Sequence, residues 1–240
     1  MNKNGNKLTI AAIGDIHAHK NVAGAFRDLF KKINEEADVL LLCGDLTNFG
    51  TVEEAEVLAD DFRDFSIPIL AVLGNHDYDS GQVPALREVL KKVKFQFLEE
   101  EPFEMGKVGF AGAKGFGGGF DQTVVAGFGE DAMKAFVREG VEECLKLENQ
   151  LSTLQAEHKI VALHYAPIAG TLEGEPLQLH PFLGTSRLAE SIDRFDVQAV
   201  FHGHAHHGKL EGATPKGALV VNCAQAILRQ NGLEYYSFQL

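Results

Sequence analysis

The chain of 240 residues carries 22 Lys and Arg against 34 Asp and Glu, which gives a formal net charge of −12. Its 45% hydrophobic and 23% charged residues are typical of a globular protein, and no apolar run approaches the length of a membrane span. An acidic surface repels nucleic acid backbones and anionic lipid, so we expect neither a membrane nor a nucleic acid as a partner.

Cysteine usage and the N-terminal sequence predict where the protein resides. Cys43, Cys144 and Cys223 are scattered and odd in number, which is typical of reduced thiols. No apolar stretch of signal-peptide length precedes Asp15. We therefore expect a cytoplasmic location. With no linker and no internal repeat, the length favours a single domain over residues 1–240. The sequence gives no indication of the oligomeric state.

The first third of the chain alternates between strand and helix patterns. Three apolar runs rich in Ile, Leu and Val end in glycine, at 7–14, 38–44 and 67–74. Such runs predict strands that are buried on both faces. Apolar residues recur at helical spacing between them, over 20–36 and 51–65. Thr51 and Glu54 fit a capping box at the start of the second helix. This order predicts parallel strands joined by helical crossovers.

The rest of the chain continues the mixture of strands and helices. Residues 82–94 favour a helix, and 103–113 favour a hairpin that turns at Gly106. A glycine-rich loop over 114–120 precedes a long helical stretch at 126–157, which we expect to be broken near Gly140. Further strands are predicted at 158–164, 197–203, 217–224 and 233–240. The last alternates between polar and apolar residues, as expected near a sheet edge.

Polar residues follow most of these strands. Asp15, Asp45 and Asn75 recur at intervals of about thirty residues, the length of one strand–helix repeat. Two later strands lead into His164 and into the segment that begins at His204. Ligands of open parallel sheets bind outside the carboxyl ends of the strands. We therefore expect five distant segments to bring their side chains to one place.

A group of carboxylates without basic neighbours needs a countercharge, and metal ions supply one. Imidazole, carboxylate and amide oxygens without thiolate suit Mn, Fe, Zn or Co better than Ca or an iron–sulfur cluster. Seven side chains are candidate metal ligands: Asp15, His17, Asp45, Asn75, His164, His204 and His206. Seven ligands are too many for one such ion but suffice for two if one carboxylate bridges them. We expect two divalent or trivalent ions of Mn, Fe or Zn.

The order of these motifs resembles a known family. Asp15-x-His17, Gly44-Asp45, Gly74-Asn75-His76-Asp77, His164 and Gly203-His204-x-His206 are similar, over residues 15–206, to the motif series of the calcineurin-like metallophosphoesterases. The resemblance implies an α/β fold, a four-layer αββα sandwich with two mixed β-sheets flanked by helices. It also implies a dinuclear site. One ion would be held by Asp15, His17 and His206, the other by Asn75, His164 and His204, and Asp45 would bridge them.

The resemblance also implies a role for the histidine that is not a ligand. His76 would act on the substrate, and Asp77 would hold it in place. Two cations roughly 3.5–4 Å apart can acidify a bridging water and place it for in-line attack on phosphorus. The departing oxygen needs a proton, which an imidazolium can donate. We therefore expect a small phosphodiester or phosphomonoester to be hydrolysed by a metal-bridging hydroxide, with His76 as general acid.

Three alternative functions remain open from the sequence. Hydrolases of nucleotide-linked lipid pyrophosphates resemble this chain in length, but they carry Arg in place of His76 and need an apolar helical cap. A nuclease is disfavoured by the charge of −12. A non-catalytic scaffold on the same fold would have lost ligands, and this chain keeps them. The segment GDLTNFG, residues 44–50, resembles the cyclic-nucleotide-phosphodiesterase-like branch.

The other histidines have no assigned chemistry. His202 lies within a predicted strand, and we expect it to be a core residue with a backbone partner. The sequence assigns no role to His19, His180 or His207. Substrate specificity depends on loops at 79–82, 114–125 and 166–185, which carry no recognisable motif.

Overall fold

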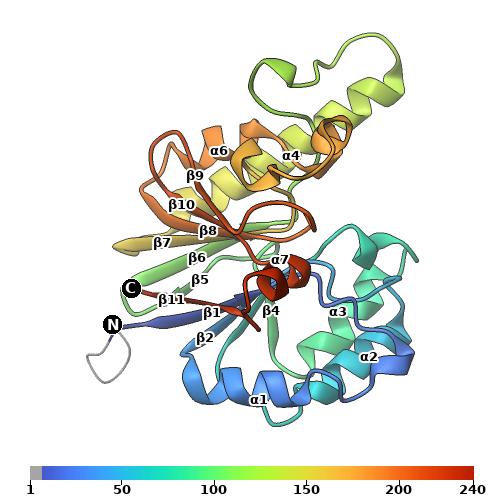
Figure 1. The fold of residues 1–240 in the computed structure, drawn as a ribbon, viewed down its shortest axis with the longest axis vertical. Coiled ribbons are helices and arrows are strands. Elements are labelled where there is room, and N and C mark those ends of the chain that lie inside the picture. Colours follow the sequence, from blue (N-terminus) through green and yellow to red (C-terminus); the bar gives the residue numbers. More distant parts are fainter. Residues whose placement is uncertain (1–6) are drawn as a thin grey trace.

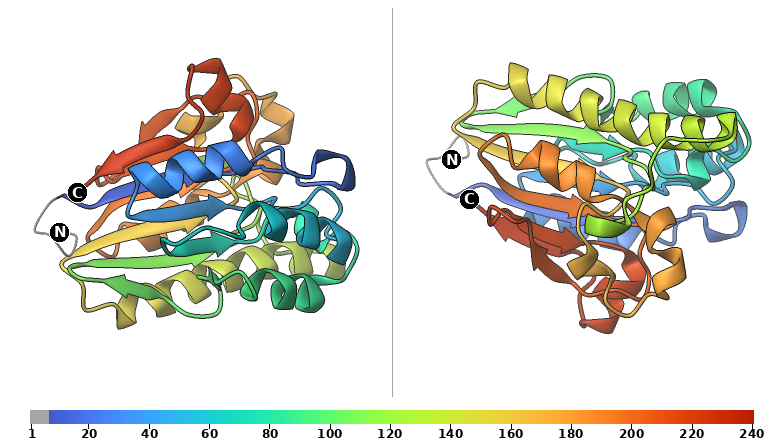
Figure 2. Two further views of the ribbon diagram at one scale, coloured as in Figure 1. Left: turned by 90° about the horizontal axis from the view of Figure 1, so that it is seen from below. Right: turned by 90° about the horizontal axis from the view of Figure 1, so that it is seen from above.

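The computed structural model describes residues 7–240, and Figure 1 shows them as four layers. Two mixed β-sheets pack face to face, and helices cover the outer face of each (Figure 2). The expected α/β sandwich is therefore confirmed. Residues 1–6, where the sequence shows no signal-peptide pattern, lie outside the described residues. Among the helices of residues 7–240, none combines the length and the apolarity that crossing a bilayer requires.

The first sheet has the strand order β11-β1-β2-β3-β4. Its strands are β1 (Thr9–Ile13), β2 (Val39–Cys43), β3 (Ile69–Val72), β4 (Phe95–Phe97) and β11 (Tyr236–Gln239). The first four are parallel and β11 is antiparallel to β1. Three helices connect the parallel strands, α1 (Arg27–Glu36), α2 (Val52–Asp61) and α3 (Val83–Lys91). The capping box of Thr51 and Glu54 is present at the start of α2, as expected.

The second sheet has the order β5-β6-β7-β8-β10-β9. Its strands are β5 (Phe103–Met105), β6 (Val108–Ala113), β7 (His158–Leu163), β8 (Val197–His202), β9 (Glu211–Ala213) and β10 (Leu219–Asn222). The four inner strands are parallel and both edge strands are antiparallel to their neighbours. The α-helices α4 (Asp131–Thr153), α5 (His180–Leu183) and α6 (Ser186–Ile192) belong to this half. The last helix, α7 (Gln225–Gln230), belongs to the other half, because its Leu228 is buried in the same cluster as Phe30 of α1. Short 3-10 helices are η1 (Lys20–Val22), η2 (His76–Tyr78), η3 (Asp121–Thr123), η4 (Ala169–Leu172) and η5 (Leu177–Leu179).

Three apolar layers hold the sandwich together. Phe30 of α1 and Leu58 of α2 are buried against the outer face of the first sheet. Leu41 and Phe110 belong to a second cluster that fills the space between the sheets. Leu147 of α4 is buried against the outer face of the second sheet. Because strands such as β2 are buried on both faces, they read as continuous apolar runs in the sequence.

Several element boundaries differ from the sequence-based expectation. The helix expected from residue 20 begins only at Arg27, after a separate 3-10 turn. The break expected near Gly140 is wrong, because α4 is continuous through it. A Cβ atom at Gly140 would lie 3.1 Å from the carbonyl oxygen of Gly117, so this glycine allows close packing of the helix on the glycine-rich loop. Five short strands and α-helices were not expected: β4, β9, α5, α6 and α7.

Candidate metal centre

The carboxyl ends of strands from both sheets meet at one end of the sandwich. Backbone hydrogen bonds join the loops that follow them. The N–H of Asp15 donates to the carbonyl of Gly44 (3.0 Å), and the N–H of His17 donates to the carbonyl of Asp45 (2.9 Å). Across the sheets, the N–H of Gly14 donates to the carbonyl of Cys223 (2.8 Å). The loops after β1 and β2 are thus fixed side by side and tied to the second sheet.

The structure brings the seven candidate ligands together, and we call them the donor cluster: Asp15, His17, Asp45, Asn75, His164, His204 and His206. Their nitrogen and oxygen atoms form overlapping groups within 4.8 Å: Asp15–His17–His206, His17–Asp45–His76 and Asp45–His164–His204. Asn75 joins the last group because its Oδ1 lies 2.9 Å from Nε2 of His164. The second group also contains His76, which is not one of the seven, so these groups do not by themselves assign each donor to one ion.

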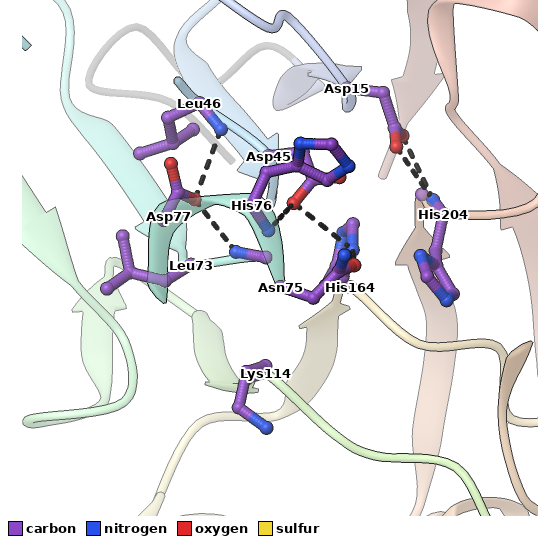
Figure 3. A network of polar contacts seen from close by, with 12 residues as sticks. Asp15, Asp45, Leu46, Leu73, Asn75, His76, Asp77, Lys114, His164 and His204 are labelled. Atoms are coloured by element: carbon purple, nitrogen blue, oxygen red, sulfur yellow. Dashed lines mark hydrogen bonds and ion pairs between the residues drawn. The ribbon is translucent and has the colours of Figure 1, made fainter. Parts of the chain in front are cut away.

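Asp45 lies in the middle of the donor cluster (Figure 3). Its Oδ2 is 3.7 Å from Nε2 of His17, and its Oδ1 is 3.5 Å from Nε2 of His164. The backbone N–H of His76 donates to Oδ1 over 2.9 Å. The side chain is almost fully buried. A carboxylate in this position faces both groups of donors at once.

Asp15 connects the two sheets at the site. Its carboxylate accepts the backbone N–H of His204 over 3.0 and 3.1 Å, as Figure 3 shows, and lies 3.0 Å from Nε2 of His206. Burial acts to raise its pKa, but the hydrogen bond with His206, the nearby ring of His164 and the N–H of His204 together lower that pKa to about 2. Asp15 is therefore ionised at neutral pH.

The ring of His164 is oriented by the backbone. Its Nδ1 lies 3.1 Å from the carbonyl oxygen of Cys43, and its Nε2 lies 2.9 Å from Oδ1 of Asn75. Burial lowers its pKa to about 4, so the ring is neutral and carries a single N–H. When that N–H donates to Cys43, the lone pair of Nε2 faces the oxygen of Asn75. A metal ion satisfies two such donors, and an outer hydrogen bond of this kind is typical of metal-ligating histidines.

The ring nitrogens of His17 show whether the site has room for a metal ion. Its Nδ1 is buried and has no hydrogen-bond partner among the described residues. Its Nε2 is 4.0 Å from Asp15 Oδ1 and 3.7 Å from Asp45 Oδ2, too far for hydrogen bonds. Separations of this size leave room for an ion at about 2.0–2.2 Å from each donor. The donors of the cluster therefore fit metal ions.

The charges of the site also indicate that it binds metal ions. Within the described part of the chain, the ion pairs of Asp15 and Asp45 involve histidines alone. Burial and the charge of Asp15 raise the pKa of Asp45 to about 6. Burial also lowers the pKa of His204 to about 3 and lowers that of His17, so these rings are neutral. Buried carboxylates beside neutral imidazoles are compensated by bound cations.

The backbone at the donor cluster is strained. Four of the six non-glycine residues with positive φ among the described residues belong to it: Asp15 (57°), His17 (47°), Asp45 (48°) and His204 (70°). This region of φ is unfavourable for residues with a side chain and is concentrated at functional sites. Gly74 adds a second constraint, because a Cβ there would lie 2.1 Å from Oδ1 of Asp45. The surrounding structure therefore fixes the directions of these side chains.

One expected contact is wrong. Asp77 was expected to hold His76, but the fully buried Asp77 carboxylate accepts the N–H groups of Leu46, Thr47 and Gly74 over 2.9–3.2 Å and the hydroxyl of Thr47 over 2.6 Å. The Nδ1 of His76 instead lies 2.7 Å from the carbonyl oxygen of Asn48. Asp77 thus joins the loops after β2 and β3. The sequence analysis assigned no role to Thr47 or Asn48. Asn48 acts through its backbone carbonyl, which no sequence pattern reveals, and Thr47 acts partly through its backbone N–H.

The remaining histidines lie outside the donor cluster. His202 is fully buried, with Nε2 2.9 Å from Oγ1 of Thr171 and Nδ1 2.8 Å from the carbonyl oxygen of Gly203, as expected for a core residue. His19 caps η1, and His207 is exposed. The ring of His180 packs against that of Phe120.

The glycine-rich loop also makes contacts within the chain. The N–H groups of Gly118 and Gly119 donate to the carbonyls of Pro181 and Gly184, over 2.7 and 2.9 Å. These two groups are therefore engaged and do not point at a substrate phosphate. The loop forms part of a wall beside the site.

Comparisons with known proteins give one family and a shared fold. The family model described as calcineurin-like phosphoesterase matches residues 8–208. A probable cyclic nucleotide phosphodiesterase of Ruthia magnifica is 24% identical over 204 residues, which cover 84% of this chain and 75% of that protein. A protein of the same description from Vesicomyosocius okutanii is 24% identical over 210 residues, 83% of this chain and 77% of the relative. The crystal structure of phosphopantetheinyl hydrolase from Mycobacterium tuberculosis has the same fold, with a TM-score of 0.67 and 16% identity over 98% of this chain and 96% of that one.

Proposed function

Because the chain belongs to the calcineurin-like phosphoesterase family, and is therefore a metal-dependent phosphoric ester hydrolase, we propose that it hydrolyses a small phosphodiester or phosphomonoester at the donor cluster. The observation that carries this proposal is the position of Asp45 between two groups of donors from both sheets. The two relatives described as probable cyclic nucleotide phosphodiesterases favour a diester, including a cyclic nucleotide.

The donor cluster divides between two ions in this proposal. Asp15, His17 and His206 hold one ion, and Asn75, His164 and His204 hold the other. Asp45 contributes to both. Mn, Fe and Zn suit donors of this kind. When bound, the ions neutralise charge on the phosphoryl oxygens and make a water nucleophilic for in-line attack.

His76 is the proton donor to the departing oxygen. Its Nδ1–H donates to the carbonyl of Asn48 over 2.7 Å, which leaves Nε2 for the substrate. Its ring meets that of His17 edge to face, with the centroids 4.7 Å apart, so the imidazole stands at the border of the donor cluster. The Asn48 carbonyl fixes the orientation of the ring. A proton supplied in this way contributes about 10²–10⁴-fold to the rate.

Asp77 is a positioning residue in this scheme. It binds the backbone on both sides of the site, at Thr47 after β2 and at Gly74 after β3. Asp45 and Asn75 are carried by these two loops. Asp77 therefore sets the distance between the bridging carboxylate and the second group of donors without touching the substrate.

Turnover assays on the Mn²⁺-loaded protein test the proposal. We expect hydrolysis of bis-p-nitrophenyl phosphate, with p-nitrophenyl phosphate and a cyclic nucleotide as comparison substrates. His76→Ala should retain both ions and lose about 10²–10⁴-fold in kcat. His158→Ala, at the start of β7 and away from the site, is the matched control and should be unchanged. A His76→Ala protein as active as wild type would contradict the general-acid role, and two bound ions with no turnover on any ester would favour a scaffold.

A further inference from the structure

A pocket of about 340 Å³ opens beside the donor cluster and is bordered by Asn75 and His204. Four aromatic side chains line it, and we call it the aromatic pocket: Phe116, Phe136, Tyr165 and Phe182. Two larger hollows, of about 620 and 660 Å³, share no residue with the donor cluster. The aromatic pocket is therefore the hollow best placed to receive part of a substrate whose phosphorus lies at the cluster.

The four rings form a continuous row that starts at a candidate metal ligand. The ring of Tyr165 lies 4.4 Å from that of His204 and 5.8 Å from that of Phe116. Phe136 follows at 5.1 Å from Phe116, and Phe182 at 6.3 Å from Phe136. Aromatic rings attract one another at centroid separations of about 4.5–7 Å. The lining of the pocket therefore offers aromatic groups of the kind that attract a further planar ring.

None of the described residues that line the pocket is an acidic or basic residue of the Asp, Glu, Lys or Arg type. Its polar lining residues are Asn75 and His204, which both belong to the donor cluster. The buried Lys114 does not line the pocket, but its amine lies 4.8 and 5.5 Å from the ring centroids of Phe116 and Tyr165. That amine donates to the carbonyl of Gly115 over 2.9 Å. A charged or strongly hydrated group would lose its water here without gaining a partner.

The wall of the pocket is tied to the donor cluster. Nε2 of His204 lies 3.2 Å from the carbonyl oxygen of Phe182, whose side chain is 60% exposed at the rim. The N–H of Gly118 donates to the carbonyl of Pro181 over 2.7 Å, which joins the glycine-rich loop to the same segment. The pocket is thus preformed, open to solvent on one side and fixed relative to the metal ligands.

We propose that the aromatic pocket binds an uncharged aromatic ring carried by one ester group of the substrate, close to the phosphorus that is attacked. This inference rests on the proposed function, which places that phosphorus at the donor cluster. The volume of about 340 Å³ is at the lower end of the range of roughly 300–1,000 Å³ for ligand sites, so one ring system fits. The pocket therefore selects substrates by their organic group, whereas the cluster acts on the phosphoryl group that all of them share.

Binding of phosphonates separates this inference from catalysis, because their C–P bond is not hydrolysed. Calorimetry on the Mn²⁺-loaded protein compares phenylphosphonate, cyclohexylphosphonate and methylphosphonate. We expect phenylphosphonate to bind about tenfold more tightly than methylphosphonate, the order expected for one stacking contact, and more tightly than cyclohexylphosphonate. Equal binding of phenyl and methyl ligands would overturn the inference, and equal or tighter binding of the cyclohexyl ligand would show an aliphatic site. Activity on bis-p-nitrophenyl phosphate together with either result would leave the proposed function standing.

Two substitutions in the same segment locate the effect. Phe182→Ala removes one of the four rings, the one at the rim, and should reduce the preference for phenylphosphonate over methylphosphonate by about threefold. Leu177→Ala is the matched control, because Leu177 is an exposed apolar residue of the same segment that does not line the pocket. It should keep the wild-type preference. A Phe182→Ala protein that binds both ligands as wild type does would contradict the assignment of the pocket.

Discussion

The donor cluster and the aromatic pocket share a border but are built in different ways. The cluster lies in short loops directly after strands of both sheets, and its two carboxylates are buried. The pocket is formed by the glycine-rich loop, by α4 and by the segment around α5, and Phe182 at its rim is largely exposed. Strand ends can hold strained, buried polar groups in fixed directions. Side chains on loops and on a helix surface can be substituted without moving those buried polar groups.

This difference suggests a division of labour. The cluster provides chemistry that does not depend on the organic part of the substrate. The pocket provides the contacts that distinguish one organic group from another. Substitutions in the cluster should therefore affect every substrate, whereas substitutions of the aromatic residues of the pocket should leave metal binding intact.

The largest effect is expected from Asp45→Asn. The substitution removes the charge of the carboxylate that faces both groups of donors. We expect loss of at least one ion per chain and a fall of at least about a thousandfold in kcat/KM, since such metal contacts contribute several kcal/mol. Elemental analysis and turnover assays measure both. Asp121→Asn is the control, because Asp121 also has positive φ (53°) but lies outside the cluster. A fully active Asp45→Asn protein would contradict the claim that the donor cluster provides the chemistry.

A smaller effect is expected from Thr47→Val. Thr47 is fully buried and its hydroxyl donates to Asp77 over 2.6 Å, so the valine leaves a buried carboxylate oxygen without this partner. We expect the free energy of unfolding to fall by about 1–3 kcal/mol and kcat to fall on the order of tenfold. Thr214→Val removes a similar hydroxyl–carboxylate bond, to Asp193, away from the site. It should cost comparable stability in denaturant melts but leave kcat unchanged.

Phe136→Ala tests whether the pocket can change independently of the cluster. The ring is half-buried, so we expect a loss of about 1–2 kcal/mol in the free energy of unfolding and an unchanged metal content. Leu145→Ala, at an exposed position of the same helix, should change stability by less than about 0.5 kcal/mol. Loss of an ion from the Phe136→Ala protein would show that the two regions are coupled.

The smallest effect concerns Glu99, a carboxylate with a side chain 9% exposed that forms an ion pair with Arg87. Its Oε2 lies 2.5 Å from Nη2 of Arg87. Burial raises its pKa to about 7 from 4.5, against the opposing charge of Arg87. The folded state therefore holds the proton more tightly than the unfolded state, so this residue lowers stability as the pH rises from 4.5 to about 7. Denaturant melts of Glu99→Gln should show a flatter pH dependence than wild type, and parallel profiles would contradict this.

The two regions also differ in how far the sequence predicts them. Asp15, Asp45 and Asn75 follow buried apolar strands at a regular interval, so their convergence could be predicted from strand pattern and topology alone. The pairing of His76 with Asn48 could not, because a backbone carbonyl leaves no mark in the sequence. The parallel order of β1, β2 and β3 followed from the helices between them in the same way.

Hydrophobic periodicity in the sequence predicts neither the short strands nor the aromatic pocket. Strands such as β4 and β9 have three residues each, too few to show a period. The break expected at Gly140 was wrong because tertiary packing against Gly117 outweighs the low helix propensity of glycine. The pocket brings Phe116, Phe136 and Phe182 together from three separate segments, and their contacts depend on loop paths that periodicity does not describe.

Anomalous diffraction from crystals grown with Mn²⁺ tests most directly whether Asp45 is shared by two ions. We expect two peaks about 3.5–4 Å apart, with the carboxylate of Asp45 between them and donors of both sheets around them. A single peak, or no peak at the donor cluster under excess Mn²⁺, would contradict the dinuclear site.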